Sequence, residues 1–510
     1  MTMAVRATRV VSLALTLLAT SCTTVSVNPS PSVHPSTGVS HLQLIEAEDA
    51  QTLDPALIDD PTSLAIGSEI FQGLTRLDAN QRPVPALAES WEISDAGRTY
   101  TFHLRSAHYQ SGATVQAQDA PAAWSRALAP ETASPLTIFF APLGERYPGD
   151  ALTGVQVVDS KTLRVQLPQA NSEFLTLLAL PPYWLADPKQ PTMGAGPYHL
   201  DKWDRGIALQ LSAFAGYWGA APTVRRVDIE IQPDNTKRLD RFTGGGADIA
   251  HGFGGAQLLA FARDPQHAAE LHRVPNPRTT WLGFNTVAGS GYGPTDRMAI
   301  AQAVDRARLT DLALFGSMLA APATDLLPPG VPGHVNRQLP GFDPAASKAA
   351  LDAASFPSRI DLYFSTNSTV GRVATDLQDQ LSIATGRTVV LHPTGDFFNQ
   401  GALDKLPFFI DTWSADIPFP SDILENILRA NSQFNNLRVF DPEIERALDQ
   451  GRAATSWDDA LKAYQQAEAT ALSQNRLIPL YSGVEPYLVR SGLHVPFVGG
   501  TIAYHWEDVR

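Results

Sequence analysis

The sequence has one cysteine, Cys22, among 510 residues. A chain with a single thiol forms no internal disulfide, so its stability must come from a hydrophobic core. Long apolar runs are also absent. The apolar run at residues 10–19 has about half of the ~20 residues that a membrane-spanning helix needs. The rest of the chain is therefore expected to be globular, and its length predicts two or three lobes.

Catalytic motifs are missing as well. The sequence contains no G-x-S-x-G elbow, no S-x-x-K pair, no H-E-x-x-H pair and no Walker A loop. The glycine run TGGGADIAHGFGG does not fit the G-x-G-x-x-G spacing, which favours a loop. For His103 and His108, on or just past a predicted strand, a solvated or core position is commoner than metal binding. We expect no enzyme activity, no metal and no cofactor.

Positive charge is scarce. Lys and Arg number 38 against 52 Asp and Glu, which gives a net charge of −14. An acidic surface repels nucleic acid and anionic lipid headgroups, so no nucleic-acid partner is expected. Only 18% of the residues are charged and 39 are prolines, a composition typical of a soluble, loop-rich globular protein.

The first 40 residues have the pattern of an export signal. Arg6 and Arg9 precede the apolar run, and small residues lead to Cys22. A small-residue run ending at cysteine resembles the bacterial lipobox, although Ala19 stands where an aliphatic residue is usual. Residues 1–22 are therefore expected to be a lipoprotein signal with lipid on Cys22, and the Ser- and Pro-rich residues 23–40 a tether. The alternative for Cys22 is a thiol in a discarded peptide.

Strand and helix patterns alternate farther along the chain. Apolar and polar residues alternate in TYTFHLR and KTLRVQLP, which predicts two half-buried strands. Helices are predicted to begin at Asp119, at Thr295 or Asp296 with an end near Gly316, and after a cap at Ser456. LIPLYSG predicts a short strand near the C-terminus. This alternation indicates an α/β protein with mixed sheets.

The stretch PFFIDTWSADIPFPSDIL predicts a binding site. Its apolar start, residues 408–413, indicates a buried strand that Pro418 and Pro420 end. Ser421 is expected to cap the next helix, with Asp422 in its first turn. Asp416 then lies on a loop leaving a strand, where α/β folds place ligands. A carboxylate enclosed there needs a cationic partner; the alternative for Asp416 is a turn residue.

Five stretches in order carry a family resemblance. They are QTLDPALIDD, SEIFQGLTRLDANQRPVPALAESWEISDAGRTYTFHLR, GAGPYHLDKWDRGIALQLSAFAGYW, WLGFNTVAGSGYGPTDRMAIAQAVDRARL and DTWSADIPFPSDIL. From about Leu44 to the C-terminus, the chain resembles the extracytoplasmic solute-binding proteins of peptide-type ABC transporters, the oligopeptide and dipeptide binding family 5.

The resemblance implies a two-lobed periplasmic-binding-protein fold of class II type, with an extra subdomain inserted in the first lobe. The first lobe would comprise residues 41–71, 194–281 and 481–510, the inserted subdomain residues 72–193, and the second lobe residues 282–480. Such lobes close over a solute by a hinge motion. Residues 283–285 are the candidate hinge, with an ordinary core strand end as the alternative.

The resemblance also implies ligand contacts. Asp416 would bind the amino end of a peptide, and the main chain of Thr412 to Ser414 would pair with the peptide as an added strand. Trp413 would line a side-chain pocket, or else pack in the core. The other expected lining residues are Asp59, Asp60, Phe139 and Phe140.

Two positions depart from the family pattern. Ile417 stands where the family commonly has an aromatic residue. Dipeptide-binding members hold the ligand's carboxylate with an arginine on the strand matching IDLYFSTNST, which has none; Arg372 is on the following helix. A longer peptide, or a ligand without a free carboxylate, is therefore expected rather than a strict dipeptide.

These observations predict a monomeric, lipid-anchored binding protein that captures peptides outside the cytoplasmic membrane and delivers them to an ABC permease. The alternative ligands on the same fold are haem, a metal chelate or an oligosaccharide, since Trp91, Trp124, Trp203 and Trp218 offer surfaces for stacking on sugars. Alternatives of other classes are a secreted hydrolase, which needs only two of the 52 acids, and an envelope lipoprotein that acts as a sensor or scaffold.

Overall fold

The computed structural model describes residues 39–144, 149, 151–285, 291–366, 368–395 and 406–510. Cys22, the predicted signal and nearly all of the predicted tether lie outside the described residues. Within the described ranges, no helix combines the length and the apolar composition that crossing a membrane requires.

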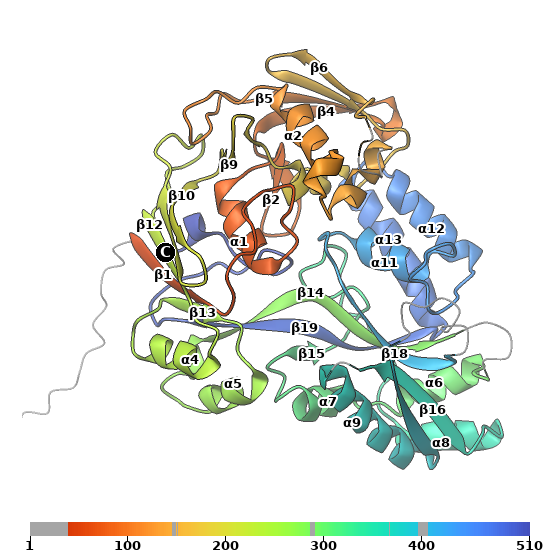
Figure 1. The fold of residues 1–510 in the computed structure, drawn as a ribbon. Coiled ribbons are helices and arrows are strands. Elements are labelled where there is room, and N and C mark those ends of the chain that lie inside the picture. Colours follow the sequence, from red (N-terminus) through yellow and green to blue (C-terminus); the bar gives the residue numbers. More distant parts are fainter. Residues whose placement is uncertain (1–38, 145–148, 150, 286–290, 367, 396–405) are drawn as a thin grey trace, which may run out of the picture. The chain divides into compact units, whose positions relative to one another are not determined.

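A large mixed sheet runs through the described chain (Figure 1). In spatial order its strands are β10 (Tyr198–Asp204), β11 (Ala208–Ala213), β12 (Arg226–Ile231), β1 (His41–Glu46), β13 (Ile249–His251), β19 (Leu477–Val489), β14 (Leu271–Phe284), β18 (Phe408–Ser414), β16 (Arg359–Ser365) and β17 (Thr388–Thr394), with β15 (Ala320–Pro322) beside β19. β1 is parallel to β12 and β13, whereas β14 and β19 are antiparallel. The predicted α/β class with mixed sheets is confirmed.

The two long central strands, β14 and β19, are interrupted by a bulge. Pro275 of β14 pairs with Val484 of β19 and Thr279 pairs with Ser482, so residues 276–278 face Gly483 alone. β13 pairs with the C-terminal end of β19, before the bulge along β14. β18 pairs with β14 from Arg278 onward, at and beyond the bulge. A Cβ on Gly483 would lie 1.9 Å from Asn276 Oδ1, so the close approach of the two strands requires glycine here.

The predicted hinge, residues 283–285, lies at the end of β14. Gly283 is paired on both sides, with Phe409 of β18 and Leu477 of β19. A Cβ on Gly283 would lie 2.5 Å from the Phe409 ring, and Asn285 is buried. Gly283 and Phe284 are thus packed strand residues and Asn285 directly follows them, which matches the alternative of an ordinary strand end.

Smaller sheets lie in the part of the chain predicted as an insert. The four-stranded sheet has the order β4 (Ala88–Ser94), β5 (Thr99–Leu104), β7 (Thr162–Gln166) and β6 (Val155–Asp159), and the two-stranded sheets are β2 (Thr75–Leu77) with β3 (Pro83–Pro85) and β8 (Ala186–Asp187) with β9 (Gln190–Gly194). β5 and β7 are the two strands predicted by alternation. Phe102 and Leu163, which are directly paired, are both fully buried.

The helices that the structure describes are α1 (Pro61–Ile70), α2 (Asp119–Leu128), α3 (Phe174–Leu177), α4 (Asn235–Thr243), α5 (Gly255–Ala262), α6 (Pro294–Gln302), α7 (Arg306–Ala313), α8 (Pro344–Ala353), α9 (Ser368–Thr385), α11 (Pro420–Leu428), α12 (Pro442–Ala453) and α13 (Trp457–Ser473). Short 3₁₀ helices are η1 (Asp95–Gly97), η2 (Pro130–Thr132), η3 (Thr137–Leu143), η4 (Pro181–Tyr183), η5 (Ala268–Glu270) and η7 (Trp506–Asp508). The predicted helix starts at Asp119 and after Ser456 are confirmed.

The single helix predicted from Thr295 to near Gly316 is wrong. Two helices, α6 and α7, occupy this stretch. Gly293 is the N-cap of α6, and its N–H donates to Asp296 Oδ2 at 2.8 Å. The Asp305 side chain accepts the N–H of Arg308 at 3.0 Å, which starts α7 as a separate helix.

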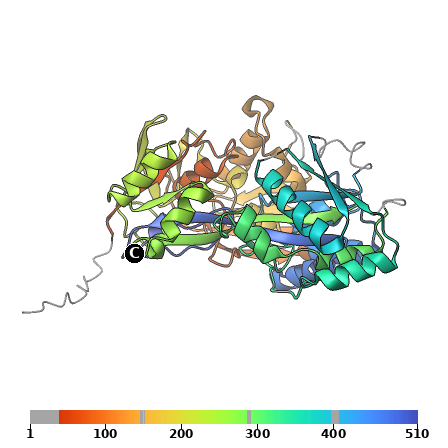
Figure 2. The ribbon, with the colours of Figure 1, turned by 90° about the horizontal axis from the view of Figure 1, so that it is seen from below.

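One hydrophobic core crosses a predicted domain boundary. Helices α6–α9 lie on one face of β14, β18 and β16, and α11–α13 on the other (Figures 1 and 2). The core around Phe102 and Trp124 of the predicted insert continues to Ile423 and Tyr464 of α11 and α13. Residues 72–193 thus share a core with helices that were assigned to the second lobe.

Candidate ligand-binding site

Among the residues that the structure describes, one edge of β18 has no strand partner at its C-terminal end. Along its whole length β18 pairs with β14, but on its other edge it pairs with β16 only where Phe409 meets Tyr363. In the described part of the chain, no strand pairs with that edge from Asp411 to Ser414. Such an edge presents main-chain N–H and C=O groups that an extended ligand can bind.

The sequence predicted a buried strand at residues 408–413. The strand is present, but only its first three residues are buried. Burial ends at Ile410, and Thr412 and Ser414 are exposed. The Thr412 hydroxyl donates to the Thr279 carbonyl at 3.0 Å, and the Ser414 hydroxyl accepts from Arg278 Nε at 3.0 Å. Both hydroxyls therefore bind β14.

Trp413 is held on one side and half-buried. Its ring meets the Phe434 ring edge-on, with 5.0 Å between the centroids. Its indole N–H donates to Asp422 Oδ2 at 3.4 Å. Both interpretations of Trp413 thus have support, because it packs on the core and keeps an exposed part.

Asp416 and Asp422 form a pair of carboxylates at the end of β18. The main-chain N–H of Asp416 donates to Asp422 Oδ2 at 2.9 Å. Asp416 is exposed, yet desolvation by its surroundings raises the pKa of its carboxyl. Burial, and secondarily the negative charge of Asp416, raises the pKa of Asp422 to about 7. Within the described ranges no Lys, Arg or His forms an ion pair with either side chain, so the pair is suited to a cationic ligand.

Asp422 was not predicted as a site residue. The sequence pattern placed it only in the first turn of α11, which is confirmed. Its contact with Asp416 arises because the chain turns back over residues 417–420 before the helix begins. Ser421 is not the cap that was predicted: Phe419 is the N-cap residue, and the Ser421 hydroxyl donates to Glu173 Oε2.

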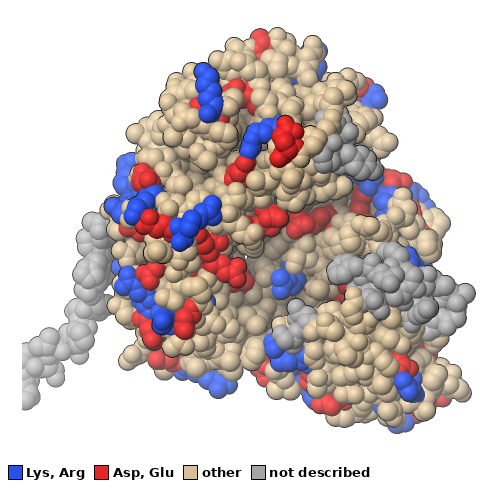
Figure 3. All heavy atoms as spheres, viewed as in Figure 1, with Lys and Arg blue, Asp and Glu red and all other residues tan. Residues whose placement is uncertain are grey.

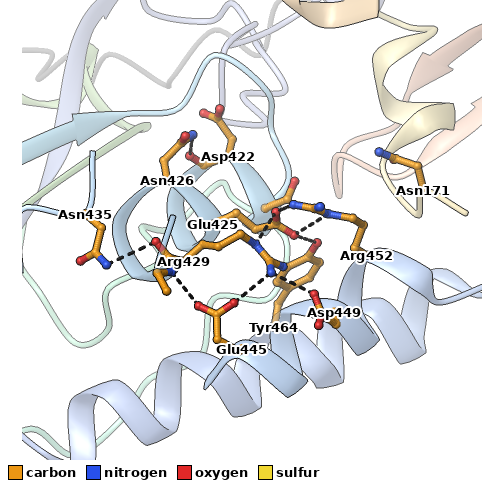
Figure 4. A network of polar contacts seen from close by, with 12 residues as sticks. Asn171, Asp422, Glu425, Asn426, Arg429, Asn435, Glu445, Asp449, Arg452 and Tyr464 are labelled. Atoms are coloured by element: carbon orange, nitrogen blue, oxygen red, sulfur yellow. Dashed lines mark hydrogen bonds and ion pairs between the residues drawn. The ribbon is translucent and has the colours of Figure 1, made fainter. Parts of the chain in front are cut away.

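A polar network fixes the other end of α11 (Figure 4). The Arg429 guanidinium contacts Glu425 of α11 at 3.3 Å, Glu445 of α12 at 3.1 Å and Asp449 of α12 at 2.9 Å. Tyr464 of α13 donates to Glu425 Oε1 at 3.0 Å. These contacts hold α11 against two helices, so Asp422 is carried on a fixed element.

Asp411 is a third carboxyl on β18. It accepts a hydrogen bond from Asn436 Nδ2 at 2.8 Å. Burial raises its pKa to about 6. Asp411 and Trp413 are two residues apart on a strand and therefore point to the same face of the sheet.

The other predicted lining residues lie just before α1 and on η3. Asp60 caps α1 by accepting the Ser63 N–H at 2.9 Å, and Asp59 is exposed. Phe139 and Phe140 lie on η3, and Phe140 is fully buried with its ring 4.7 Å from that of Tyr183. Phe140 is therefore part of the core, and its pocket-lining role stays a prediction. No hydrogen bond or ion pair among the described residues joins any of these four to Asp416.

The tryptophans considered for sugar stacking are mostly engaged. Trp124 is fully buried. Arg205 covers the ring of Trp203 at 3.5 Å from the centroid, and Arg105 covers that of Trp218 at 3.7 Å. Trp91 packs beside Phe102. These contacts weaken the oligosaccharide alternative.

Histidine gives no metal centre in the described ranges. His103 Nε2 lies 4.0 Å from Glu92 Oε1 on the four-stranded sheet, whereas His108 forms an isolated bridge with Thr114. No group of three or more His, Cys, Asp and Glu side chains in the described part of the chain is arranged to hold a metal ion.

Comparison with known families identifies the family of this chain. Residues 82–435 match the family described as bacterial extracellular solute-binding proteins, family 5 Middle. The chain belongs to this family. The resemblance stated from the five sequence stretches is thereby confirmed.

Curated relatives of this family 5 protein carry different ligand names. It is 27% identical, over 90% of both chains, to the probable deoxycholate-binding periplasmic protein YgiS of Escherichia coli. It is 25% identical to the glutathione-binding protein GsiB of Salmonella typhimurium, over 84% of this chain and 86% of that protein. It is also 25% identical to heme-binding protein A of Haemophilus influenzae, over 84% and 85%.

Solved structures establish the fold. The unliganded open form of the periplasmic murein tripeptide binding protein MppA superposes with a TM-score of 0.84 at 22% identity, over 92% of this chain and 97% of that one. HbpA2 from Haemophilus parasuis gives a TM-score of 0.79 at 20% identity, over 92% and 99%. The predicted two-lobed binding-protein fold is confirmed.

Proposed function

We propose that this family 5 protein captures peptides outside the cytoplasmic membrane and delivers them to the permease of an ABC importer. The observation that carries the proposal is the Asp416–Asp422 pair beside the open edge of β18. Two desolvated carboxylates repel each other, and a ligand ammonium relieves that repulsion. The open edge supplies main-chain hydrogen bonds that do not depend on the ligand's side chains.

The test compares peptides with free and acetylated amino ends. Asp416→Asn should weaken binding of a free-amino tripeptide library by about 10- to 100-fold, the loss expected for one charge-assisted hydrogen bond. Acetylated peptides should bind wild type and variant alike. Asp240→Asn, at an exposed aspartate of α4, is the matched control. Equal losses for both peptide classes would remove the role assigned to Asp416.

The names of the relatives define the competing ligands. Deoxycholate carries a carboxylate and no cation, so the Asp416–Asp422 pair disfavours it, whereas glutathione carries an ammonium. Thermal unfolding with deoxycholate, haemin, glutathione and the peptide library separates these ligands, because a saturating ligand adds ~2.7 kcal/mol at 100 times its dissociation constant. A hydrolase would consume the peptides, and a scaffold would show neither effect.

The anchor is a separate part of the proposal. We expect Cys22 to carry lipid that holds the protein to the cell membrane, with residues 23–40 as the tether. Mass spectrometry of the mature protein from its native membrane measures this directly. An unmodified N-terminus, or one that lacks Cys22, contradicts the anchor and leaves the peptide site unaffected.

Lobe closure would take place at the bulge in the central strands. Residues 276–278 of β14 lack regular pairing with β19, and β13 and β18 flank the strand pair on opposite sides of this point. Irregular strand positions absorb backbone rotation more easily than residues 283–285, which are packed between two strands.

A further inference from the structure

We propose that Arg278 binds the anionic group of the ligand whose ammonium Asp416 binds, so that the preferred cargo carries both charges. This inference rests on the proposed function of the same site. It assigns a ligand contact on β14, a different strand from the one that carries the arginine of dipeptide-binding members.

The bulge places Arg278 beside the site. Arg278 is the last of the three bulged residues, and it pairs across the sheet with Ser414 of β18. The adjacent residue, Pro277, accepts the N–H of Ala415 through its carbonyl at 2.9 Å. Asp416 follows directly. β-Bulges re-aim side chains in this way, here toward the open end of β18.

One hydrogen bond orients the guanidinium. Arg278 Nε donates to the Ser414 hydroxyl at 3.0 Å, which holds the group over β18. The side chain is exposed and forms no ion pair within the described ranges. Because a guanidinium is planar with donors in a fixed fork, using Nε for Ser414 leaves both Nη groups for a carboxylate.

The distances across a sheet suit such a contact. A ligand added to the open edge of β18 lies one strand spacing, about 4.8 Å, beyond it. Arg278 starts from the strand on the other side and already reaches the Ser414 side chain on β18. A carboxylate on the same face of the added strand is therefore within reach of its Nη groups, and Asp416 lies two residues beyond Ser414.

Arg278 also acts on Tyr481 of β19, on the other side of β14, together with a second guanidinium. Burial raises the pKa of Tyr481, while a hydrogen bond with Thr280 and the charges of Arg278 and Arg372 lower it. Both arginines therefore act on one phenol. Arg372 of α9 lies over the Phe315 ring at 4.8 Å and donates through Nε to the Ala313 carbonyl at 3.2 Å.

The experiment uses a tripeptide library prepared as free C-terminal acids and as C-terminal amides. Retention on the full-length protein is measured by mass spectrometry. Wild type should prefer acids to amides by about 10-fold, and Arg278→Gln should abolish that preference while keeping the preference for free over acetylated amino ends. Arg278→Lys, which keeps the charge but not the fork, should retain part of it.

Arg273→Gln is the matched control, since Arg273 is an exposed arginine of the same strand on the far side of the bulge. This variant should keep the acid preference of wild type. An acid preference that survives in Arg278→Gln, or one that wild type lacks, overturns the inference while leaving Asp416 in place. If no free-amino peptide binds wild type, the proposed function fails first and this inference fails with it.

Discussion

At the scale of single residues, Asp422 holds two residues that the sequence predicted to contact the ligand, Trp413 and Asp416. Its carboxylate accepts hydrogen bonds from the Trp413 indole and from the Asp416 main chain. With a pKa of about 7, its carboxyl gains charge as the pH rises from 5.5 to 7.5. Free-amino peptides keep their ammonium below a pKa of ~7.7. Their affinity for wild type should therefore increase over this range, and Asp422→Asn should flatten the increase and weaken binding at pH 7.5 by about 10-fold. Calorimetry across the range measures both effects.

Asp411→Asn is the control for that measurement. Asp411 also has a raised pKa, about 6, but its carboxylate binds Asn436 rather than the Asp416 loop. Its substitution should leave the change between pH 6.5 and 7.5 in place. Parallel curves for wild type and Asp422→Asn would show that Asp422 does not act on the ligand.

The sequence predicted Asp416 and Trp413 because their signals are local: an apolar run, two prolines and a helix start within a few residues. Asp422 escaped because its contact depends on how the chain turns back, which no periodic pattern encodes. The complete burial of Phe140 was missed for a related reason. Two adjacent aromatics do not reveal which one the core covers, and here the ring of Tyr183 packs on Phe140.

At the scale of elements, the bulge between β14 and β19 depends on Gly483. A methyl group there would overlap the Asn276 side chain and lie 2.9 Å from Arg278 Cβ. Gly483→Ala should therefore lower the free energy of unfolding by about 1–3 kcal/mol, the usual cost of overpacking. Denaturant unfolding measures this cost.

Asn276→Ala supplies the internal control for the bulge. Removing the amide oxygen that the methyl group would meet should make Gly483→Ala less costly in that background than in wild type, a coupling that a double-mutant cycle detects. Equal costs in both backgrounds would mean that the two side chains do not compete for this space.

The bounds of strands and helices were predicted well where local signals set them and poorly where distant contacts did. Alternation alone identified β5 and β7. The helix from Thr295 was drawn too long because its apolar spacing continues through Asp305, where the cap of α7 interrupts it. β19 was predicted too short. Its last residues, Val484 to Val489, pair with β14 and β13, and this distant pairing leaves no local signal in the sequence.

At the scale of the whole molecule, acidic and basic side chains are interspersed on the face drawn in Figure 3, without one large basic patch. The excess of acid nevertheless has a cost. Carboxylates crowd together at Asp416 and Asp422, and Glu507 has its pKa raised to about 7, first by burial and then by the charge of Glu69. Self-repulsion of this kind grows as the carboxyls lose their protons.

Stability should therefore fall as the pH rises. A carboxyl whose pKa is higher in the folded than in the unfolded chain contributes stability that is complete below ~4 and is lost as the pH rises through the folded value. For Asp411, Asp422 and Glu507 that loss ends near pH 7. Burial lowers the pKa of His251, but the charge and hydrogen bond of Glu46 raise it to about 10, so its contribution is complete below ~6.5 and is lost as the pH approaches 10.

Carboxyls with lowered pKa, such as Asp361 and Asp441, act in the opposite direction, but their stabilisation is complete above about pH 5. The melting temperature of the unliganded protein should thus be higher at pH 5 than at pH 8, and lower again at pH 10. Asp422→Asn should reduce the first difference, and His251→Gln the second. Scanning calorimetry at the three pH values provides the measurement. A melting temperature that rises from pH 5 to pH 8 would mean that the buried carboxyls are charged in the folded protein at pH 5.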